Sequence, residues 1–264
     1  MAQLQYNREG ALYFPDGFGD PWGVTMSSDG TIFVVDNEKG QVNMFSANRK
    51  YIRTIGSLGE APGELHNPAG VSSSDEGLLF VANNCNHCLE VFNENNGTFV
   101  KRIGQGELKN PWDVVTLGGS KVYVADTFNE RIAVFSQDGE FAGSFGSRGR
   151  GPGQFACPAG LAFSPDGYLY VTNRDSQSLH VFTANGRFVK SIVSEALCKP
   201  IGIDIGEDGQ ILVANCLGSS VAVFDKDGKH LYSFHADNAH GVAVSPTGYL
   251  LVTERSAKHV AVFS

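Results

Sequence analysis

Hydrophobic and polar positions alternate in short runs along the whole chain, and the runs recur in a fixed order. Runs such as "GVTMS", "IFVVD" and "VNMF" are apolar or place apolar residues at every second position, which is typical of β-strands. Polar turn sequences such as "SSDG" and "SPDG" separate them. The pattern predicts an all-β chain of short antiparallel strands.

The runs belong to one unit that occurs six times. The copies open at Trp22, Ala69, Trp112, Ala159, Ile201 and His240. A polar residue follows 14 positions after each of these: Asp36, Asn83, Asp126, Asn173, Asn215 and Glu254. A phenylalanine follows 9 positions later: Phe45, Phe92, Phe135, Phe182, Phe224 and Phe263. Two fixed spacings in six copies indicate an internal repeat with cores at 22–45, 69–92, 112–135, 159–182, 201–224 and 240–263.

Each copy predicts four strands, because a further strand such as "YIRTIG" or "FVKRIG" follows the phenylalanine. Four antiparallel strands at a period of about 40 to 47 residues are typical of β-propeller blades. We therefore expect residues 1–264 to form a single domain, a six-bladed β-propeller of four-stranded antiparallel blades. The sixth copy reaches Ser264 without its fourth strand, and residues 10–16, "GALYFPD", resemble it. We expect this N-terminal strand to complete the last blade and close the ring.

The composition narrows the class of protein. The formal net charge of −8 argues against a surface that attracts polyanions in general, and we expect no DNA partner. The chain has no run of 18 apolar residues and its first residues lack the core of a signal peptide, so we expect no membrane association. Five scattered cysteines favour reduced thiols, and we expect a cytoplasmic protein.

The repeat resembles a known family. The pattern P-x-G-V…G-x-[IL]-x-V-x-D/N…V-x-V-F recurs, and the local matches are "NNCNHCLEVF" (83–92), "DTFNERIAVF" (126–135) and "FGSRGRGPGQFACPAGLAF" (145–163). These resemble the NHL repeat over roughly residues 10–264, and the chain is similar to the C-terminal NHL domain of tripartite-motif (TRIM-NHL) proteins. The resemblance implies a six-bladed fold in a ubiquitin ligase that binds RNA or protein partners. Some six-bladed relatives are lyases or lactonases.

Three features invite a chemical interpretation. The six polar residues from Asp36 to Glu254 could form a calcium site, but a residue type repeated in every blade favours turn hydrogen bonds. The sequence "CNHC" at 85–88 could bind zinc, yet no second cysteine pair has a matching spacing, so we expect ordinary thiols and no metal. Asp113 and Asp204 break a row of small residues that faces the channel, and each needs water, a cation or a donor.

The face that carries the entry into each innermost strand, here called the top, holds the candidate binding residues. The six opening residues should ring the channel mouth, where Trp22 and Trp112 either plug the core or anchor a partner. Basic residues gather near the third and fourth copies. They are either solvated or paired with Glu130, Asp175 and Glu195, or they contact a partner. The candidate partner-binding residues are Trp22, Lys109, Trp112, Phe128, Arg131, Arg148, Arg150, Arg174, Lys199 and His240.

These features predict a non-catalytic binding module without cofactor. We expect the top face to bind a protein or peptide segment, as the recognition domain of a TRIM-type ubiquitin ligase or scaffold. A second hypothesis is an RNA-binding domain for single strands, because arginines beside Trp112 and Phe128 suit stacked bases. A third is a propeller lyase or lactonase, although the sequence has no Gly-x-Ser-x-Gly elbow and no phosphate loop.

Overall fold

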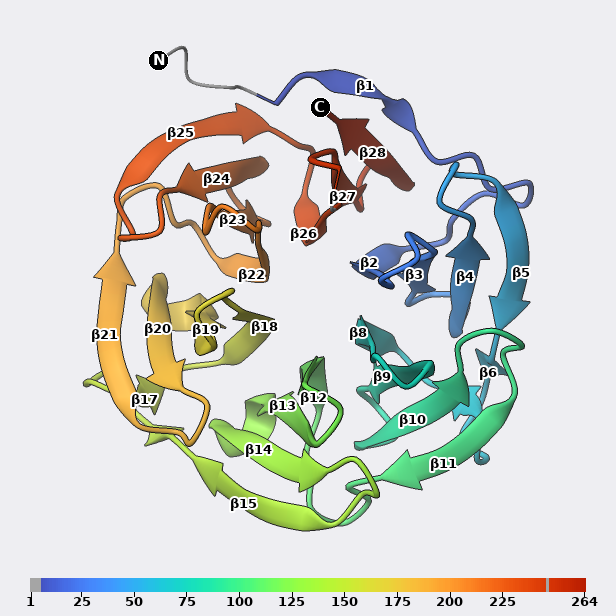
Figure 1. Ribbon diagram of the computed structural model, residues 1–264, viewed down its shortest axis with the longest axis horizontal. Coiled ribbons are helices and arrows are strands. Elements are labelled where there is room, and N and C mark those ends of the chain that lie inside the picture. Colours follow the sequence, from blue (N-terminus) through green and yellow to red (C-terminus); the bar gives the residue numbers. More distant parts are fainter. Residues whose placement is uncertain (1–5, 246) are drawn as a thin grey trace.

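The chain forms a ring of six four-stranded antiparallel sheets around a central channel (Figure 1). The computed structural model describes residues 6–245 and 247–264. Blade 1 comprises β2 (Pro21–Met26), β3 (Ile32–Asp36), β4 (Gln41–Phe45) and β5 (Tyr51–Ile55). Blade 2 comprises β8 (Pro68–Ser73), β9 (Leu78–Asn83), β10 (Cys88–Asn93) and β11 (Phe99–Ile103). Blade 3 comprises β12 (Pro111–Leu117), β13 (Lys121–Asp126), β14 (Arg131–Ser136) and β15 (Phe141–Phe145).

The other three blades follow the same order from the channel outward. Blade 4 comprises β18 (Pro158–Phe163), β19 (Tyr168–Asn173), β20 (Ser178–Thr183) and β21 (Phe188–Val193). Blade 5 comprises β22 (Pro200–Ile205), β23 (Ile211–Asn215), β24 (Ser220–Phe224) and β25 (His230–His235). Blade 6 comprises β26 (Ala239–Val244), β27 (Leu250–Glu254), β28 (His259–Phe263) and the N-terminal β1 (Arg8–Ala11). The predicted six-bladed fold is confirmed.

The N-terminal strand closes the ring, as predicted, but at different residues. β1 pairs antiparallel with β28, with Gly10 opposite Val262 and Ala11 opposite Ala261. The prediction of residues 10–16 was wrong in its bounds, since the strand ends at Ala11. Leu12 and Phe14 instead turn inward and are buried in the core between blades 6 and 1. Leu12 and Phe14 are apolar because they pack between two blades, and not because they belong to a strand with alternating apolar positions.

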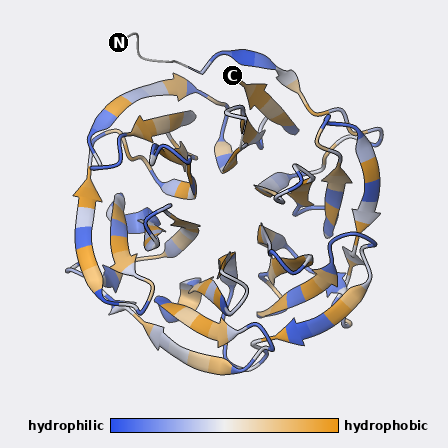
Figure 2. Cartoon of the chain, viewed as in Figure 1, coloured by the Kyte–Doolittle hydropathy of each residue, from blue (hydrophilic) through white to orange (hydrophobic). Residues whose placement is uncertain are grey.

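The core lies between neighbouring blades. Figure 2 shows hydrophobic residues along the strands of every blade and hydrophilic residues in the connections. The repeated phenylalanines are all at most 3% exposed: Phe45, Phe92, Phe135, Phe182, Phe224 and Phe263. Burial of one such side chain stabilises the fold by about 1.5–3 kcal/mol. The fixed spacing of the repeat therefore records one packing contact made six times.

Glycines at the second position of most repeats let the innermost strands approach one another. A Cβ on Gly160 would lie 2.1 Å from the carbonyl oxygen of Ile201, and a Cβ on Gly202 would lie 2.2 Å from that of His240. Both distances are far below van der Waals contact. Only glycine fits there, so the channel wall is built from closely packed backbone.

Candidate functional site: the top face and the channel

The top face consists of the connections between successive blades and the turns between the second and third strand of each blade. The connections span residues 12–20, 56–67, 104–110, 146–157, 194–199 and 236–238, and the turns span 37–40, 84–87, 127–130, 174–177, 216–219 and 255–258. Two turns contain short 3-10 helices, η1 (Thr127–Asn129) and η2 (Arg174–Ser176). Two connections contain short parallel strand pairs, β6 (Ser57–Leu58) with β7 (Glu64–Leu65) and β16 (Ser147–Arg148) with β17 (Gln154–Phe155).

The six repeated polar residues bind these two sets of loops together. Each is fully buried and accepts a hydrogen bond from a backbone N–H 17 positions earlier in the preceding connection. For example, Asn173 Oδ1 accepts from Ala156 N at 2.8 Å, and Asp126 Oδ1 from Lys109 N at 2.7 Å. The role is structural, as expected, but the donor that all six share lies in the adjoining connection; Asp36 also accepts an N–H bond from Lys39 in its own turn, at 3.2 Å. The ring therefore fixes the loops that form the top face.

The predicted ring of opening residues brings three aromatic side chains together at the channel mouth. The indole rings of Trp22 and Trp112 meet edge to face with centroids 5.9 Å apart. The ring of His240 lies 4.8 Å from that of Trp22. Burial, followed by the Arg255 charge, lowers the pKa of His240 to about 3, so its imidazole is neutral near pH 7. The two tryptophans are therefore contact partners across the mouth.

Two arginines lie over these indoles. Arg255 Cζ is 4.7 Å from the Trp22 ring centroid, and Arg174 Cζ is 5.5 Å from that of Trp112. Asp20 holds the first arrangement, since its carboxylate pairs with Arg255 at 2.5 Å and accepts Trp22 Nε1–H at 2.8 Å. Both arginines directly follow a residue of the polar ring. Arg174 and Arg255 therefore occupy equivalent positions of the repeat, and Arg174 was predicted as a site residue. Arg255 and Asp20 were not predicted, although the aligned repeats show the equivalence of the two arginines.

The predicted basic residues fall into two groups. Three are already engaged: Arg131 Nε with Asp126 Oδ2 at 2.7 Å, Lys199 Nζ with Asp175 Oδ1 at 2.6 Å, and Arg174 Nη1 with Asp175 Oδ1 at 3.2 Å. Lys109, Arg148 and Arg150 are exposed. Arg148 is 89% exposed and approaches Glu130 at 3.3 Å. Unpaired positive charge on this sector therefore comes mainly from Arg150 and Lys109, whereas Arg148 is exposed but paired with Glu130.

Of the five most exposed large apolar side chains of the described residues, four lie in the loops of the top face and one, Val193, is the last residue of the outer strand β21. The five are Val193, Tyr13, Leu217, Phe128 and Leu58, with exposed fractions of 78, 75, 70, 60 and 59%. Phe128 lies on the turn of blade 3, where its N–H bonds to the carbonyl of Lys109. The predicted residue Phe128 is thus free to contact a partner, while Leu217 and Tyr13 were not predicted.

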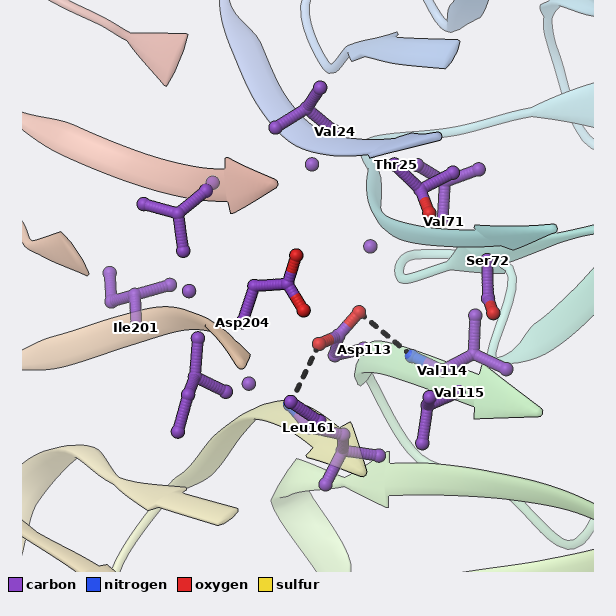
Figure 3. Close-up of a pocket in the computed structure, with 18 of the residues that line it drawn as sticks. Val24, Thr25, Val71, Ser72, Asp113, Val114, Val115, Leu161, Ile201 and Asp204 are labelled. Carbon is purple, nitrogen blue, oxygen red and sulfur yellow. Dashed lines mark hydrogen bonds between the residues drawn. The ribbon is translucent and has the colours of Figure 1, made fainter. Parts of the chain in front are cut away.

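Asp113 and Asp204 face one another inside the channel, as Figure 3 shows. The channel contains a half-open cavity of about 240 Å³. Asp113 accepts N–H bonds from Leu161 at 2.8 Å and Val114 at 2.9 Å. Asp204 accepts them from Val244 at 2.7 Å and Ile205 at 2.8 Å. Backbone donors thus serve both carboxyls, one of them supplied in each case by the next blade.

The cysteine sequence 85–88 shows no metal-binding geometry. In the described parts of the chain, no three His, Cys, Asp or Glu residues are grouped so that they could hold a metal ion. Burial, together with the nearby Glu90 carboxylate, raises the pKa of the Cys88 thiol to about 12. The absence of zinc stays a prediction. Within the described residues, no helix is long and apolar enough to cross a membrane.

Comparison with known proteins identifies the family that the repeats resemble. The NHL repeat family matches residues 18–43, 65–92 and 155–182. Over 132 residues the chain is 30% identical to the protein brain tumor of Drosophila melanogaster, covering 49% of this chain and 13% of that protein. Over 160 residues it is 27% identical to the E3 ubiquitin-protein ligase NHLRC1 of Rattus norvegicus, covering 57% of this chain and 40% of that protein. The chain therefore matches less than half the length of either relative.

Solved structures show the same fold at low identity. A gluconolactonase of Xanthomonas campestris superposes with a TM-score of 0.73 over 98% of this chain and 97% of that chain, at 15% identity. Identity at this level establishes the architecture alone. The chain is therefore a six-bladed propeller with NHL repeats, distantly homologous to the TRIM-NHL proteins.

Proposed function

We propose that this propeller is a non-catalytic binding module whose top face contacts a protein or peptide partner. The observation that carries the proposal is the concentration of exposed apolar side chains on one face. Four such residues, Tyr13, Leu58, Phe128 and Leu217, each at least 59% exposed, lie on top-face loops that the buried polar ring holds in place. An exposed apolar side chain that a rigid frame holds in place can anchor a partner.

The sector at blades 3 and 4 is the centre of the proposed surface. Phe128, Arg148 and Arg150 are exposed there, next to Trp112 with its overlying Arg174. Arginine and aromatic residues carry much of the binding energy in protein interfaces. Exposed guanidinium groups favour a partner with acidic residues. The sector therefore suits an acidic segment that also presents an apolar side chain to Phe128.

A peptide partner is favoured over single-stranded RNA because other side chains cover the indole rings at the channel mouth. A base stacks on an open aromatic face. The guanidinium of Arg174 covers one face of Trp112, and Trp22 meets it edge to face. Among the described residues of this sector, only Phe128 leaves an aromatic side chain mostly exposed.

The proposal also covers the kind of protein in which the propeller serves as a domain. The relatives include an E3 ubiquitin-protein ligase of which this chain matches 40%. We therefore infer that the propeller serves as the recognition domain of a TRIM-type ligase or scaffold in the cytoplasm. Catalysis by the propeller itself would need an accessible reactive group. At the top end of the channel, Trp22, Trp112 and His240 pack together instead.

Selection from libraries tests the proposal. A random peptide library and a random RNA pool are each offered to the immobilised propeller, and enriched binders are measured at fixed salt. We expect enriched acidic peptides, and at least about tenfold weaker binding to Arg148→Glu/Arg150→Glu, about 1.4 kcal/mol. The matched control, Lys226→Glu/Lys229→Glu on a bottom turn, should bind as the wild type does.

Two results would contradict it. Enrichment of RNA alone would favour the RNA-binding hypothesis, and its affinity should then fall steeply with salt. Equal binding of peptides by the wild type and Arg148→Glu/Arg150→Glu would mean that the blade 3 and 4 sector is not the binding surface.

A further inference from the structure

The channel contains two carboxyl groups that the proposed partner surface does not use. Asp113 replaces the glycine found at the same position of the other five repeats, and Asp204 stands where four other repeats have threonine, serine or alanine. Gly70 leaves the space for the first group, because a Cβ there would lie 2.0 Å from Asp113 Oδ1. The two substitutions place acids on opposite parts of one wall, pointing toward each other (Figure 3).

Each carboxyl also links two blades. Asp113 of blade 3 accepts the Leu161 N–H of blade 4, and Asp204 of blade 5 accepts the Val244 N–H of blade 6. These bonds resemble the hydroxyl bridges at other junctions, where Thr172 donates to Ile201 O at 2.7 Å and Thr253 donates to Trp22 O at 2.6 Å. Asp113 and Asp204 are therefore part of the contacts that hold the ring closed.

The surroundings favour the neutral acid. Burial raises the pKa of Asp113 to about 7, with a further increase from the charge of Asp204. Burial likewise raises the pKa of Asp204 to about 6. Besides Asp113 and Asp204, the described residues that line the cavity include one other titratable side chain, His240 at the mouth. Its imidazole is neutral near pH 7 because its pKa is lowered to about 3. Among the described residues, no cationic side chain lines the cavity to balance two negative charges.

We propose that Asp113 and Asp204 act as one carboxyl pair that holds a single proton across the channel and makes the closed ring sensitive to pH. One proton then serves both acids, and each still accepts its backbone N–H bonds because a carboxyl group has several acceptor positions. Loss of the shared proton leaves two like charges facing one another across the channel. The pair therefore titrates as a unit rather than as two independent acids.

The sign of the effect follows from the direction of both shifts. In the unfolded chain both acids ionise near their ordinary pKa, whereas the folded chain retains protons up to near pH 7. The folded state thus binds more protons between about pH 4 and 7. The pair contributes its whole stabilisation below the pKa of the acids in the unfolded chain, near pH 4. This contribution is lost as the pH rises through the folded pKa values of about 6 and 7.

Carbon-13 NMR of the aspartate side chains tests the pair directly. We expect the Asp113 carboxyl to titrate with a midpoint above about pH 5.5, and in two steps shared with Asp204. Denaturant unfolding gives a second measurement. Between pH 5.5 and 8 the unfolding constant of the wild type should rise at least about tenfold more than that of Asp113→Gly/Asp204→Ala. That variant restores residues that other repeats carry, so it should fold.

The single variant Asp204→Ala separates pairing from simple burial. Without its partner, Asp113 should titrate in one step at a lower midpoint, because the repulsion that raises its pKa is gone. Midpoints of both wild-type carboxyls below about pH 4.5, or equal pH dependence of wild type and double variant, would overturn the proposal. An unchanged Asp113 midpoint in Asp204→Ala would overturn the sharing of the proton.

Discussion

The two glycine-rich connections of the top face, residues 56–67 and 146–157, share a backbone and differ in the side chains that surround it. Both contain a short parallel strand pair. Both place glycines with positive φ at the same three positions, Gly56, Gly59 and Gly63 in one and Gly146, Gly149 and Gly153 in the other. The repeat therefore fixes the path of both loops, and only the side chains can distinguish their functions.

The first difference is the attachment to the blade below. Glu90 is fully buried and pairs with Arg102 at 2.5 Å. Together they hold the first loop, since Glu90 Oε2 accepts the Gly63 N–H at 3.2 Å and Arg102 Nη2 donates to the carbonyls of Glu60 and Ala61 at 3.0 and 2.9 Å. In blade 4 the same two positions are occupied by His180 and Ser191, which pair across the strands as Glu90 and Arg102 do.

The second difference is charge. Glu60 and Glu64 of the first loop correspond to Arg150 and Gln154 of the second. His180 packs 5.7 Å from Phe155 beneath the second loop, and its Nδ1 has no hydrogen-bond partner among the described residues. The acidic loop is thus held by a buried ion pair, and the basic loop is left freer to adapt. Functional differences in a repeat protein lie in such departures between equivalent positions.

The largest expected effect is on the stability that the ion pair gives the acidic loop. Arg102→Met leaves the Glu90 carboxylate buried without its guanidinium, which should lower the free energy of unfolding by about 3 kcal/mol. Denaturant unfolding measures this. The matched change Arg148→Met removes an exposed arginine and should cost less than about 0.5 kcal/mol. Similar losses for both variants would show that the two loops are held alike.

Transfer of the ion pair should make the second loop resemble the first. In His180→Glu/Ser191→Arg, a carboxylate becomes available to the Gly153 N–H, the counterpart of Gly63. A charge-assisted hydrogen bond of about 1.4 kcal/mol should slow hydrogen exchange at Gly153 about tenfold. The single change His180→Glu buries an unpaired carboxylate and should destabilise the protein. If the double variant exchanged at the wild-type rate, His180 and Ser191 would not explain the freedom of this loop.

Acid should loosen the basic loop selectively. Burial lowers the pKa of His180, so the unfolded state gains a proton first as the pH falls below about 6.5. The neutral imidazole therefore contributes its whole stabilisation above about pH 6.5. This contribution is lost as the pH falls from there to the lower pKa of His180 in the folded protein. Hydrogen exchange between pH 7.5 and 5, corrected for the intrinsic rate, should show up to about tenfold faster opening at residues 146–157 than at 56–67. The variant His180→Phe should abolish this difference, and persistence there would contradict the assignment to His180.

The smallest effect concerns the side chains that close each loop. Glu64 Oε2 accepts the Ala61 N–H, and Gln154 Oε1 accepts the Gly151 N–H, each at 3.0 Å. Since an oxygen acceptor is kept, Glu64→Gln and Gln154→Glu should each change the free energy of unfolding by less than about 0.5 kcal/mol. Gln154→Glu should still weaken acidic-peptide binding slightly. A stability change above 1 kcal/mol would mean that the loops depend on charge at this position.

The architecture was predictable because it depends on contacts that recur. The phenylalanines Phe45 to Phe263 and the polar ring each make one contact six times, so the spacing of the sequence records them. The bounds of the closing strand were missed because Leu12 and Phe14 serve packing between blades rather than the sheet. A local hydrophobic pattern does not distinguish these two uses.

The site was predictable only in outline. The sequence indicated that Trp22, Trp112 and His240 would meet at the mouth, since they share one repeat position. It left open whether the basic residues are paired, naming Asp175 as one partner, and it did not indicate that Arg131 would pair with Asp126. Such pairing depends on distances between side chains of different turns, or of a turn and a connection, which no spacing in the sequence specifies.

The central claim is that partners bind at blades 3 and 4 through the basic loop, while the acidic loop of the same backbone does not contact them. Hydrogen–deuterium exchange of the full chain, with and without a peptide selected as described above, tests it most directly. We expect protection at residues 127–130, 146–157 and 174–177, and unchanged exchange at 56–67. Protection at 56–67 or on the bottom turns, with residues 146–157 unaffected, would contradict the claim.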